Sequence, residues 1–116
     1  MSIKVSIDAS GGDFGFPVTV NASIKALNSF NDLYINLVGD EKKITLHLNN
    51  SNLNQSLLNR IDVTHSTEVI HMDDSASTAL RHKKDSSMRV AINLVKNGKA
   101  DACVSAGNTG ALMSIS

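Results

Sequence analysis

The segment "IKVSIDASGGDFGFPV" (residues 3–18) contains the pattern that decides the fold. Its first apolar residues alternate with polar ones, which predicts a strand over about 3–8. A glycine-rich turn follows. Pro17 then suits the first turn of a helix, where its missing N–H costs nothing. An apolar stripe extends this helix to about residue 29. The segment therefore predicts a strand, a glycine-rich turn and a helix in succession.

The same order of elements recurs along the rest of the chain. Three more strands are predicted over 33–38, 61–65 and 100–105. The strand over 61–65, the third in chain order, could continue through Val69 and Ile70. Helical regions are predicted over about 41–59, from Ser75 or Ser77 to near Lys83, from Asp85 or Ser86 to Gly98, and from Ala111 onward. Strands that alternate with helices indicate an α/β fold with a parallel sheet covered on both faces.

Composition narrows the function classes. The chain has 116 residues, 41% of them hydrophobic, and a formal net charge of zero, which suits one domain of modest size. The neutral balance and the scarcity of aromatic residues argue against nucleic-acid binding. A single cysteine permits no internal disulfide and fits a cytoplasmic location. The first residues do not form a signal peptide, and no stretch approaches the roughly 20 apolar residues of a membrane span.

Two loops combine a high glycine content with a favourable position. The first follows the first strand and includes Asp8, Gly11, Gly12 and Asp13. The second, "SAGNTG" (105–110), follows the fourth strand. In open parallel sheets, ligands bind beyond the carboxyl ends of the strands, near the point where the strand order reverses. If the first and fourth strands are neighbours, both loops face one crevice.

The second loop has the chemistry of a phosphate or oxyanion site. Glycines let the backbone approach a ligand closely, and the N–H groups at a helix start attract anions. Asn108 and Thr109 add short side-chain donors. The candidate residues of this loop are Ser105, Gly107, Asn108, Thr109 and Gly110. A tight strand-to-helix turn that binds nothing remains an alternative.

Because carboxylates repel phosphate, we expect Asp8 and Asp13 of the first loop to have a role other than binding phosphate. They can orient a basic side chain, cap the following helix, or act as acid or base. Capping is the favoured role for Asp13, whereas Asp8 ends an apolar strand, where a functional partner is more common.

Basic and hydroxyl side chains supply further candidates. Arg81 and Lys84 in "RHKK" (81–84) can contact an anionic substrate or an acidic partner, although a solvated helix face also explains them. Ser86 and Ser87 open the next helix and can help bind phosphate, although capping explains at least one of them.

Other chemistries are poorly supported. His71, Asp73 and Asp74 have metal-ligand side chains without a second cluster, so no metal site is predicted. Cys103 lies inside a predicted strand, where a small buried residue is expected. Ser105 lacks the G-x-S-x-G pattern of serine hydrolases, and the chain has no G-x-x-x-x-G-K-[ST] motif.

Three segments resemble the start of the bacterial phosphate acyltransferases of phospholipid synthesis. They are "IDASGGDFGFP" (7–17), "LVGD" (37–40) and "RHKKDSSMRVAINLVKNGKADACVSAGNTGALM" (81–113). The resemblance covers essentially the whole chain. It implies a Rossmann-like α/β/α sandwich related to phosphotransacetylases and isocitrate-dehydrogenase-like enzymes. Ala76–Ser77 replace the family's usual Pro-Ser pair, which removes no reactive group. Family members are considerably longer, so we expect residues 1–116 to be the N-terminal part of one acyltransferase domain, inactive alone.

The resemblance also implies a reaction, in which acyl-acyl-carrier protein and inorganic phosphate give acyl phosphate and free carrier. Phosphate would sit among the N–H groups of 107–110, with Asp8 and Asn108 in catalytic roles and Arg81 or Lys84 as the basic residue. Family members look like cytoplasmic homodimers that associate peripherally with the membrane, where a membrane acyltransferase uses the product. No metal or organic cofactor is implied.

Two alternatives stay open from the sequence. One is a phosphotransacetylase-like enzyme that uses acyl-CoA as its acyl donor. The other is an inactive fragment that serves as a binding module and docks an acidic carrier protein through Arg81, Lys83, Lys84 and Arg89.

Overall fold

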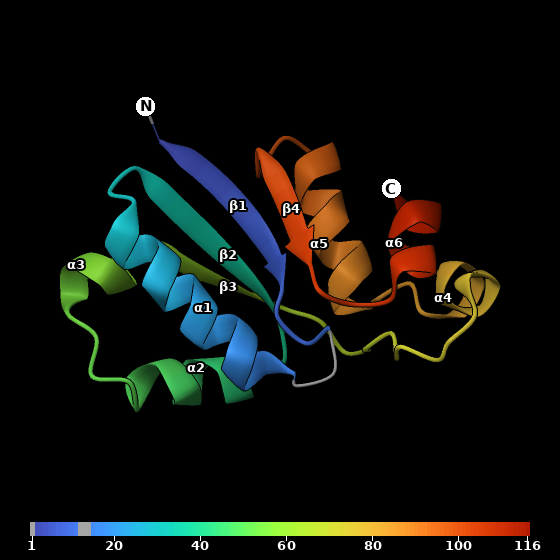
Figure 1. The fold of residues 1–116 in the computed structure, drawn as a ribbon, viewed down its shortest axis with the longest axis horizontal. Coiled ribbons are helices and arrows are strands. Elements are labelled where there is room, and N and C mark those ends of the chain that lie inside the picture. The colour runs from blue at the N-terminus through green and yellow to red at the C-terminus, as the bar shows by residue number, and fades with distance from the viewer. Residues whose placement is uncertain (1, 12–14) are drawn as a thin grey trace.

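A four-stranded parallel sheet forms the centre of the molecule (Figure 1). The computed structural model describes residues 2–11 and 15–116. The strands are β1 (Ile3–Asp8), β2 (Leu33–Gly39), β3 (Ile61–His65) and β4 (Ala102–Ser105), in the spatial order β3-β2-β1-β4. The predicted α/β class with a parallel sheet is confirmed.

The strand order reverses at the junction of β1 and β4. From β1 the chain moves outward to β2 and β3, then crosses back to add β4 on the other side of β1. In the register, Asp8 of β1 lies opposite Val38 of β2 and opposite Ser105 of β4. The predicted pairing of the first and fourth strands is therefore confirmed, and the two glycine-rich loops leave the sheet at the same edge.

Three helices build the hydrophobic core on one face of the sheet. They are α1 (Phe16–Ser29), α2 (Glu41–Asn49) and α3 (Gln55–Leu58). Their buried side chains, Val20, Leu27, Ile44, Leu48 and Leu57, pack with Ile35 and Leu37 of β2. This cluster packs the three helices against β2, and Ile7 of β1 is partly buried against it.

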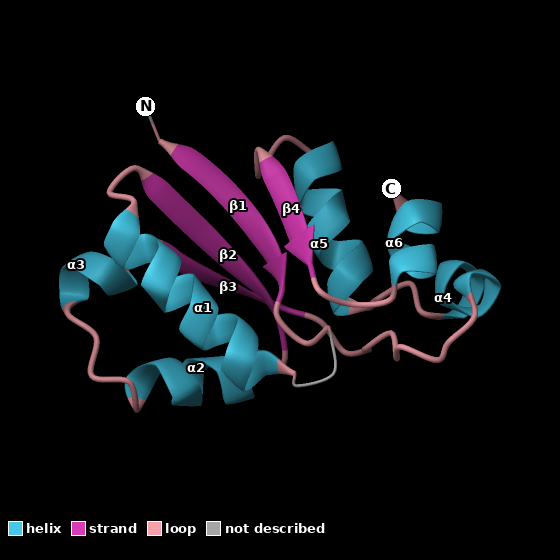
Figure 2. Ribbon diagram, viewed as in Figure 1, coloured by secondary structure: helices cyan, strands magenta, loops and turns pink. Residues whose placement is uncertain are grey.

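The other face carries α5 (Ser87–Lys96), which contacts β1, β2 and β4. Beside α5, at the β4 end of the molecule, α4 (Ala76–His82) and α6 (Thr109–Ile115) pack against each other (Figure 2). A second cluster joins these helices and consists of Ile70, Ala79, Met88, Ile92, Ala111 and Ile115. Helices therefore flank the sheet on both faces, as the sequence predicts, while Val104 of the edge strand β4 stays 55% exposed.

The helix ends follow the capping residues of the sequence. Ser75, rather than Ser77, accepts a hydrogen bond from the Thr78 N–H at the start of α4. Ser86, rather than Asp85, caps α5 through the Arg89 N–H at 3.1 Å. Gly98, directly after the C-cap of α5, has a φ of 73°, which glycine adopts without strain.

Four predicted boundaries are wrong, and one of them is the start of the fourth strand, which begins at Ala102 rather than at residue 100. The helical region over 41–59 is split in two, and Asn52 in the connection has a φ of 53°. The third strand ends at His65, so Val69 and Ile70 lie in the loop that crosses toward α4, and Ile70 is buried in the second cluster. The last helix begins at Thr109 rather than at Ala111. Among the described residues, no helix has both the length and the apolar composition that crossing a membrane requires.

Candidate active site

Asp8 is the centre of a buried hydrogen-bond network at the carboxyl end of β1. Asp8 is only 1% exposed. One carboxylate oxygen, Oδ1, accepts hydrogen bonds from the Gly11 N–H at 3.1 Å and from the Ser87 hydroxyl at 2.5 Å. The other, Oδ2, accepts the Ser105 hydroxyl at 2.8 Å. These donors meet the need of a buried carboxylate for partners, and they join the loop after β1, the start of α5 and the end of β4.

Ser105 connects this hydrogen-bond network to the second glycine-rich loop. While its hydroxyl hydrogen is directed to Asp8, its oxygen accepts the Gly107 N–H at 3.1 Å. A hydroxyl can donate one hydrogen bond and accept others, so a single side chain fills both tasks. The position of the loop 106–108 is therefore set by the carboxylate of β1.

Two glycines of these loops lie close to neighbouring side chains. A Cβ atom on Gly11 would lie 2.4 Å from Asp8 Oδ2, and one on Gly107 would lie 3.0 Å from Met88 Cε and 3.2 Å from Ser105 Oγ. A larger residue at position 11 would displace the Asp8 carboxylate, whereas one at position 107 would need Met88 and Ser105 to move by a few tenths of an ångström. The glycine content that marks these loops in the sequence thus comes in part from packing around Asp8.

Both ends of the Asn108 side-chain amide are hydrogen-bonded within the protein. It is 8% exposed, and its Oδ1 accepts the Ala111 N–H at 3.1 Å, which makes it the N-cap of α6. Its Nδ2 donates to the carbonyls of Asp74 at 2.7 Å, His71 at 3.1 Å and Met72 at 3.3 Å. The amide therefore fastens the loop 71–74 to the start of α6. A direct contact between Asn108 and phosphate stays a prediction.

The loop 71–74 is held from its other side by Lys83. The Lys83 ammonium group lies 2.5 Å from Asp74 Oδ2 and also donates to the Val69 carbonyl at 2.9 Å. Asp74 Oδ2 accepts the His71 N–H at 2.8 Å as well. The hydrogen bond from Lys83, followed by that from His71, lowers the pKa of Asp74 below its usual value. This pair was missed by sequence reasoning, because a nine-residue separation across a loop and a helix gives no periodic signal.

The remaining predicted site residues are distributed unevenly. Asp8, Gly11, Ser87, Ser105 and Gly107 are brought together. Ser86 is a buried helix cap. Arg81 and Lys84 are exposed, and within the described ranges neither has a hydrogen bond to the glycine-rich loops. Thr109 and Gly110 are exposed at the start of α6, where helix geometry leaves their N–H groups without an intrahelical acceptor. Gly12 and Asp13 lie outside the described residues.

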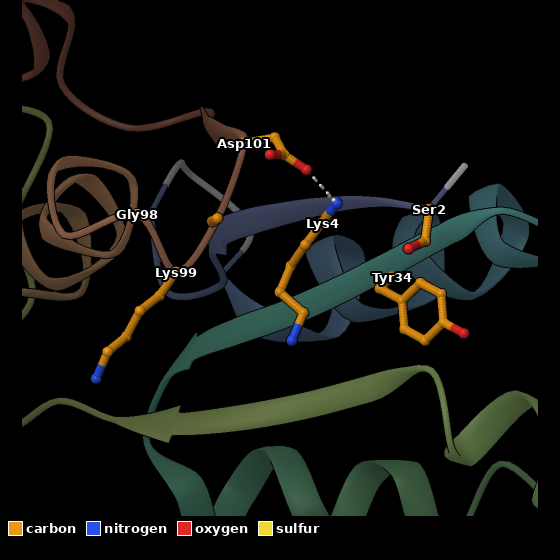
Figure 3. Close-up of a pocket in the computed structure, with 7 residues that line it drawn as sticks. Ser2, Lys4, Tyr34, Gly98, Lys99 and Asp101 are labelled. Carbon is orange, nitrogen blue, oxygen red and sulfur yellow. Dashed lines mark hydrogen bonds between the residues drawn. The ribbon is translucent and has the colours of Figure 1, made fainter.

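A pocket of about 410 Å³ lies at the opposite edge of the sheet (Figure 3). It is lined in part by Lys4, Tyr34 and Asp101. Figure 3 shows the Asp101 carboxylate turned toward the backbone N–H of Lys4, which donates to it at 2.9 Å. The Lys4 ammonium group pairs with Asp62 at 3.0 Å. Because parallel sheets bind ligands at the carboxyl ends of their strands, this pocket is not the candidate active site.

Comparison with known proteins shows the family. The model of the family described as "Fatty acid synthesis protein" matches residues 3–116. A protein of Vesicomyosocius okutanii named "Phosphate acyltransferase" is 62% identical over 116 residues, which are the whole chain and 34% of that protein. Proteins of the same name from Ruthia magnifica and Hydrogenovibrio crunogenus are 60% and 53% identical over the same share of each. The chain thus spans about a third of the length of these relatives. With nearly all of its residues matched by the family model, the chain belongs to this fatty acid synthesis protein family.

Proposed function

We propose that this chain supplies the N-terminal third of a phosphate acyltransferase that makes acyl phosphate from acyl-acyl-carrier protein and inorganic phosphate. The observation that carries the proposal is the 62% identity, over the whole chain, to a protein named phosphate acyltransferase. The network of Asp8, Ser87 and Ser105 supports it, because it shapes two loops at the edge where such sheets bind ligands. The product would feed glycerophospholipid synthesis.

In this proposal, Asp8 acts as a positioning residue. Both of its carboxylate oxygens already accept hydrogen bonds from three segments, and the residue is buried. A group in that setting cannot reach a substrate, but it can hold the loops 9–11 and 105–108 in one arrangement. Catalytic sites need such fixed supports, because small displacements of the reacting groups cost rate.

The exposed start of α6 is the proposed place for the phosphate. The N–H groups of Thr109 and Gly110 are available there, and Asn108 fixes their direction by capping the helix. One phosphate oxygen attacks the thioester carbonyl of the acyl group. A carbon–oxygen bond forms, the carbon–sulfur bond breaks, and the carrier leaves as a thiolate that then takes up a proton. Backbone donors stabilise the negative oxygen of the tetrahedral intermediate.

The exposed cations of α4 and its C-terminal side are the proposed contact for the carrier protein. Arg81 and Lys84 are exposed and positively charged, so they complement an acidic partner. Homodimer formation, a cytoplasmic location and a peripheral association with the membrane belong to the same proposal for the full-length protein.

The proposal is tested in a chimera in which this chain replaces the matching third of the V. okutanii relative. We expect the chimera to form acyl phosphate from acyl-acyl-carrier protein in the presence of phosphate, and the 116-residue chain alone to be inactive. Acyl-CoA, tested as the donor in parallel, separates the two enzyme classes. A folded chimera that turns over acyl-CoA but not the carrier-bound substrate, or neither of them, would overturn the proposal.

A further inference from the structure

A short segment after β3 pairs with the start of α5. Glu68 and Ser86 form an isolated parallel bridge outside the four strands. In this bridge the Glu68 N–H donates to the Asp85 carbonyl at 3.2 Å, and the Ser87 N–H donates to the Glu68 carbonyl at 3.0 Å. Figure 1 shows the segment leaving β3 and passing the start of α5 on its way to α4. The bridge therefore joins the end of β3 to the start of α5.

Side chains on both segments reinforce the bridge. Asp85 Oδ2 accepts the Thr67 hydroxyl at 2.5 Å and the Thr67 N–H at 2.9 Å. In return, Glu68 Oε1 accepts the Asp85 N–H at 3.1 Å. We call the residues Thr67, Glu68 and Asp85 the clasp. Thr67 and Asp85 are exposed, so water competes for each bond and each adds little stability alone. Several bonds between the same two segments nevertheless fix their relative position.

The clasp spans the base of a long excursion of the chain. Residues 69–84 leave the sheet, carry α4 and pack against α6 through Ile70 and Ala79. Without the clasp, the end of β3 and the start of α5 would be connected only through this excursion and through the packing of α5 on the sheet. Because Thr67 and Glu68 bind Asp85 directly, the start of α5 is held by the end of β3 itself.

Ser87 connects the clasp to the candidate active site. While its N–H donates to the Glu68 carbonyl, its hydroxyl donates to Asp8 Oδ1 at 2.5 Å. The same oxygen accepts the Gly11 N–H at 3.1 Å. Ser87 is only 1% exposed, so water has little access to replace its hydroxyl at the carboxylate. The hydrogen bonds around Asp8 therefore depend on where the clasp holds Ser87.

The middle of α5 has separate attachments to the sheet. The Ser6 hydroxyl donates to the Ala91 carbonyl at 2.7 Å, and Met88 and Ile92 are buried. These contacts should keep the helix in place when the clasp is removed. They act beyond the first residue of α5, however, and hydrogen bonds weaken steeply as their distance and angle depart from the optimum. A small displacement at the start of the helix is thus enough to disturb the bond from Ser87 to Asp8.

We infer that Asp85 is a positioning residue for acyl transfer, which acts through the clasp and Ser87 on the Asp8 carboxylate. The inference deepens the proposed function and rests on it for the effect on the rate. Among the described residues, Asp85 has no hydrogen bond to either glycine-rich loop. Loss of the clasp should therefore lower kcat rather than raise KM, because it loosens the loops that Asp8 holds without removing a group that binds substrate.

The first measurement follows the amide chemical shifts of the folded 116-residue chain. Asp85→Ala should move the signal of Gly11, whose N–H shares Asp8 Oδ1 with the Ser87 hydroxyl. Signals from β2 should stay in place. Because these shifts are read from folded molecules, a loss of stability alone does not move them. Asp73→Asn, which removes an exposed carboxylate within the excursion, is the control and should leave the Gly11 signal unchanged.

The second measurement is the steady-state rate of the chimera with acyl-acyl-carrier protein and phosphate. Asp85→Ala should lower kcat about 5- to 10-fold and change KM by less than about 2-fold. Thr67→Val, which keeps the shape but loses the hydroxyl, should lower kcat by a smaller factor. Thr67→Ser keeps the hydroxyl and should have the rate of the unchanged chimera. The double variant Thr67→Val/Asp85→Ala should be no slower than Asp85→Ala alone, because both changes remove the same clasp.

A Gly11 signal that Asp85→Ala leaves in place, or an unchanged kcat, would overturn the inference. Losses that add up in the double variant would also overturn it, since they would show that Thr67 and Asp85 act independently. If Asp85→Ala does not fold, Thr67→Val and Thr67→Ser give the same comparison with a smaller change. A chimera that transfers no acyl groups, while the Gly11 signal moves as expected, would overturn only the proposed function.

Discussion

The Ser105 hydroxyl donates a 2.8 Å hydrogen bond to Asp8 Oδ2, and the same two residues face each other as register partners at the ends of β4 and β1. The backbone pairing and the side-chain hydrogen bond thus join the ends of β1 and β4 at the point where the strand order reverses. Because Asp8 also binds Gly11 and Ser87, one carboxylate fixes three segments that are far apart in the sequence.

Replacement of Asp8 should show how much of the edge depends on it. Asp8→Ala leaves the donors of Gly11, Ser87 and Ser105 without their buried acceptor. We expect the free energy of unfolding to fall by about 2–4 kcal/mol, measured by urea denaturation. Asp8→Asn keeps the size and one carbonyl acceptor, so its loss should be smaller. An Asp8→Ala chain as stable as the unchanged one would contradict the buried network.

The two glycines of the loop 105–110 make a matched pair. A Cβ on Gly107 would be 3.0 Å from Met88 Cε, whereas one on Gly110 would have no described neighbour nearer than 3.5 Å. We expect Gly107→Ala to lower the melting temperature by several degrees, because about 1–2 kcal/mol is lost when the packing shifts. Gly110→Ala, inside the first turn of α6, should be neutral or slightly stabilising. Equal melting temperatures for both variants would rule out the close approach at Gly107.

Much of this arrangement could be predicted from short-range patterns. Alternation over 3–8 and the cap residue Ser86 mark their elements directly, and the order of strands and helices indicates which loops share an edge. Burial by tertiary contacts gives no comparable signal. Ile70 packs against buried residues of α4, α5 and α6, which explains its apolar side chain. Because Val69 beside it is also β-branched, the two residues together wrongly predict a continuation of the third strand.

The candidate site was predictable only as a set of residues. Asp8, Ser105 and Gly107 stand out by type and position, but their sequence does not show which atoms meet. Asn108 has a donor group that suits phosphate, yet its amide is used by three carbonyls of the loop 71–74. No periodic pattern links that loop to residue 108, because the contact depends on how α4 and α6 pack.

Asn108 can be divided into its two tasks by substitution. Asn108→Asp keeps an oxygen to cap α6 but loses the donor to the loop 71–74, and Asn108→Ala loses both. In urea denaturation we expect both variants to lower the free energy of unfolding, and Asn108→Asp by at least as much as Asn108→Ala, because its second carboxylate oxygen faces three carbonyl oxygens without a donor. Both variants should speed amide hydrogen exchange at Asp74, which lies in the loop that the amide holds. Unchanged exchange there would contradict the fastening role.

Asp85 gives the protein a defined acid response. The Thr67 hydroxyl and then the Thr67 N–H donate to its carboxylate and lower the pKa of Asp85 below its usual value. The stabilisation is complete above the unfolded pKa of about 3.9 and is lost as the pH falls through the lower folded pKa. Asp85→Asn should therefore be less stable than the unchanged chain at pH 7, and the difference should shrink as the pH falls below about 4.

Thermal melts between pH 7 and pH 2 measure this response. Asp73→Asn, which changes an exposed aspartate on the loop before α4, is the control for the loss of one negative charge. If the difference between Asp85→Asn and the unchanged chain were constant with pH, the bonds from Thr67 would not be the source of the lowered pKa.

Cys103 should react slowly as long as the protein is folded. It lies half-buried in β4, and burial is the main cause that raises the pKa of its thiol above the usual value. The thiolate is the form that reacts with iodoacetamide, so a raised pKa leaves little of it at pH 7.5. We expect the alkylation rate, measured by mass spectrometry, to be at least about 10-fold slower than that of the same chain unfolded in urea. The native rate should increase with pH beyond the value of about 8.5 at which an ordinary thiol is half ionised.

Cys103→Ala should leave the acyl-transfer activity of the chimera unchanged, since no step of the proposed reaction uses the thiol. A native thiol that reacts as fast as the unfolded one at pH 7.5 would contradict its burial in the sheet.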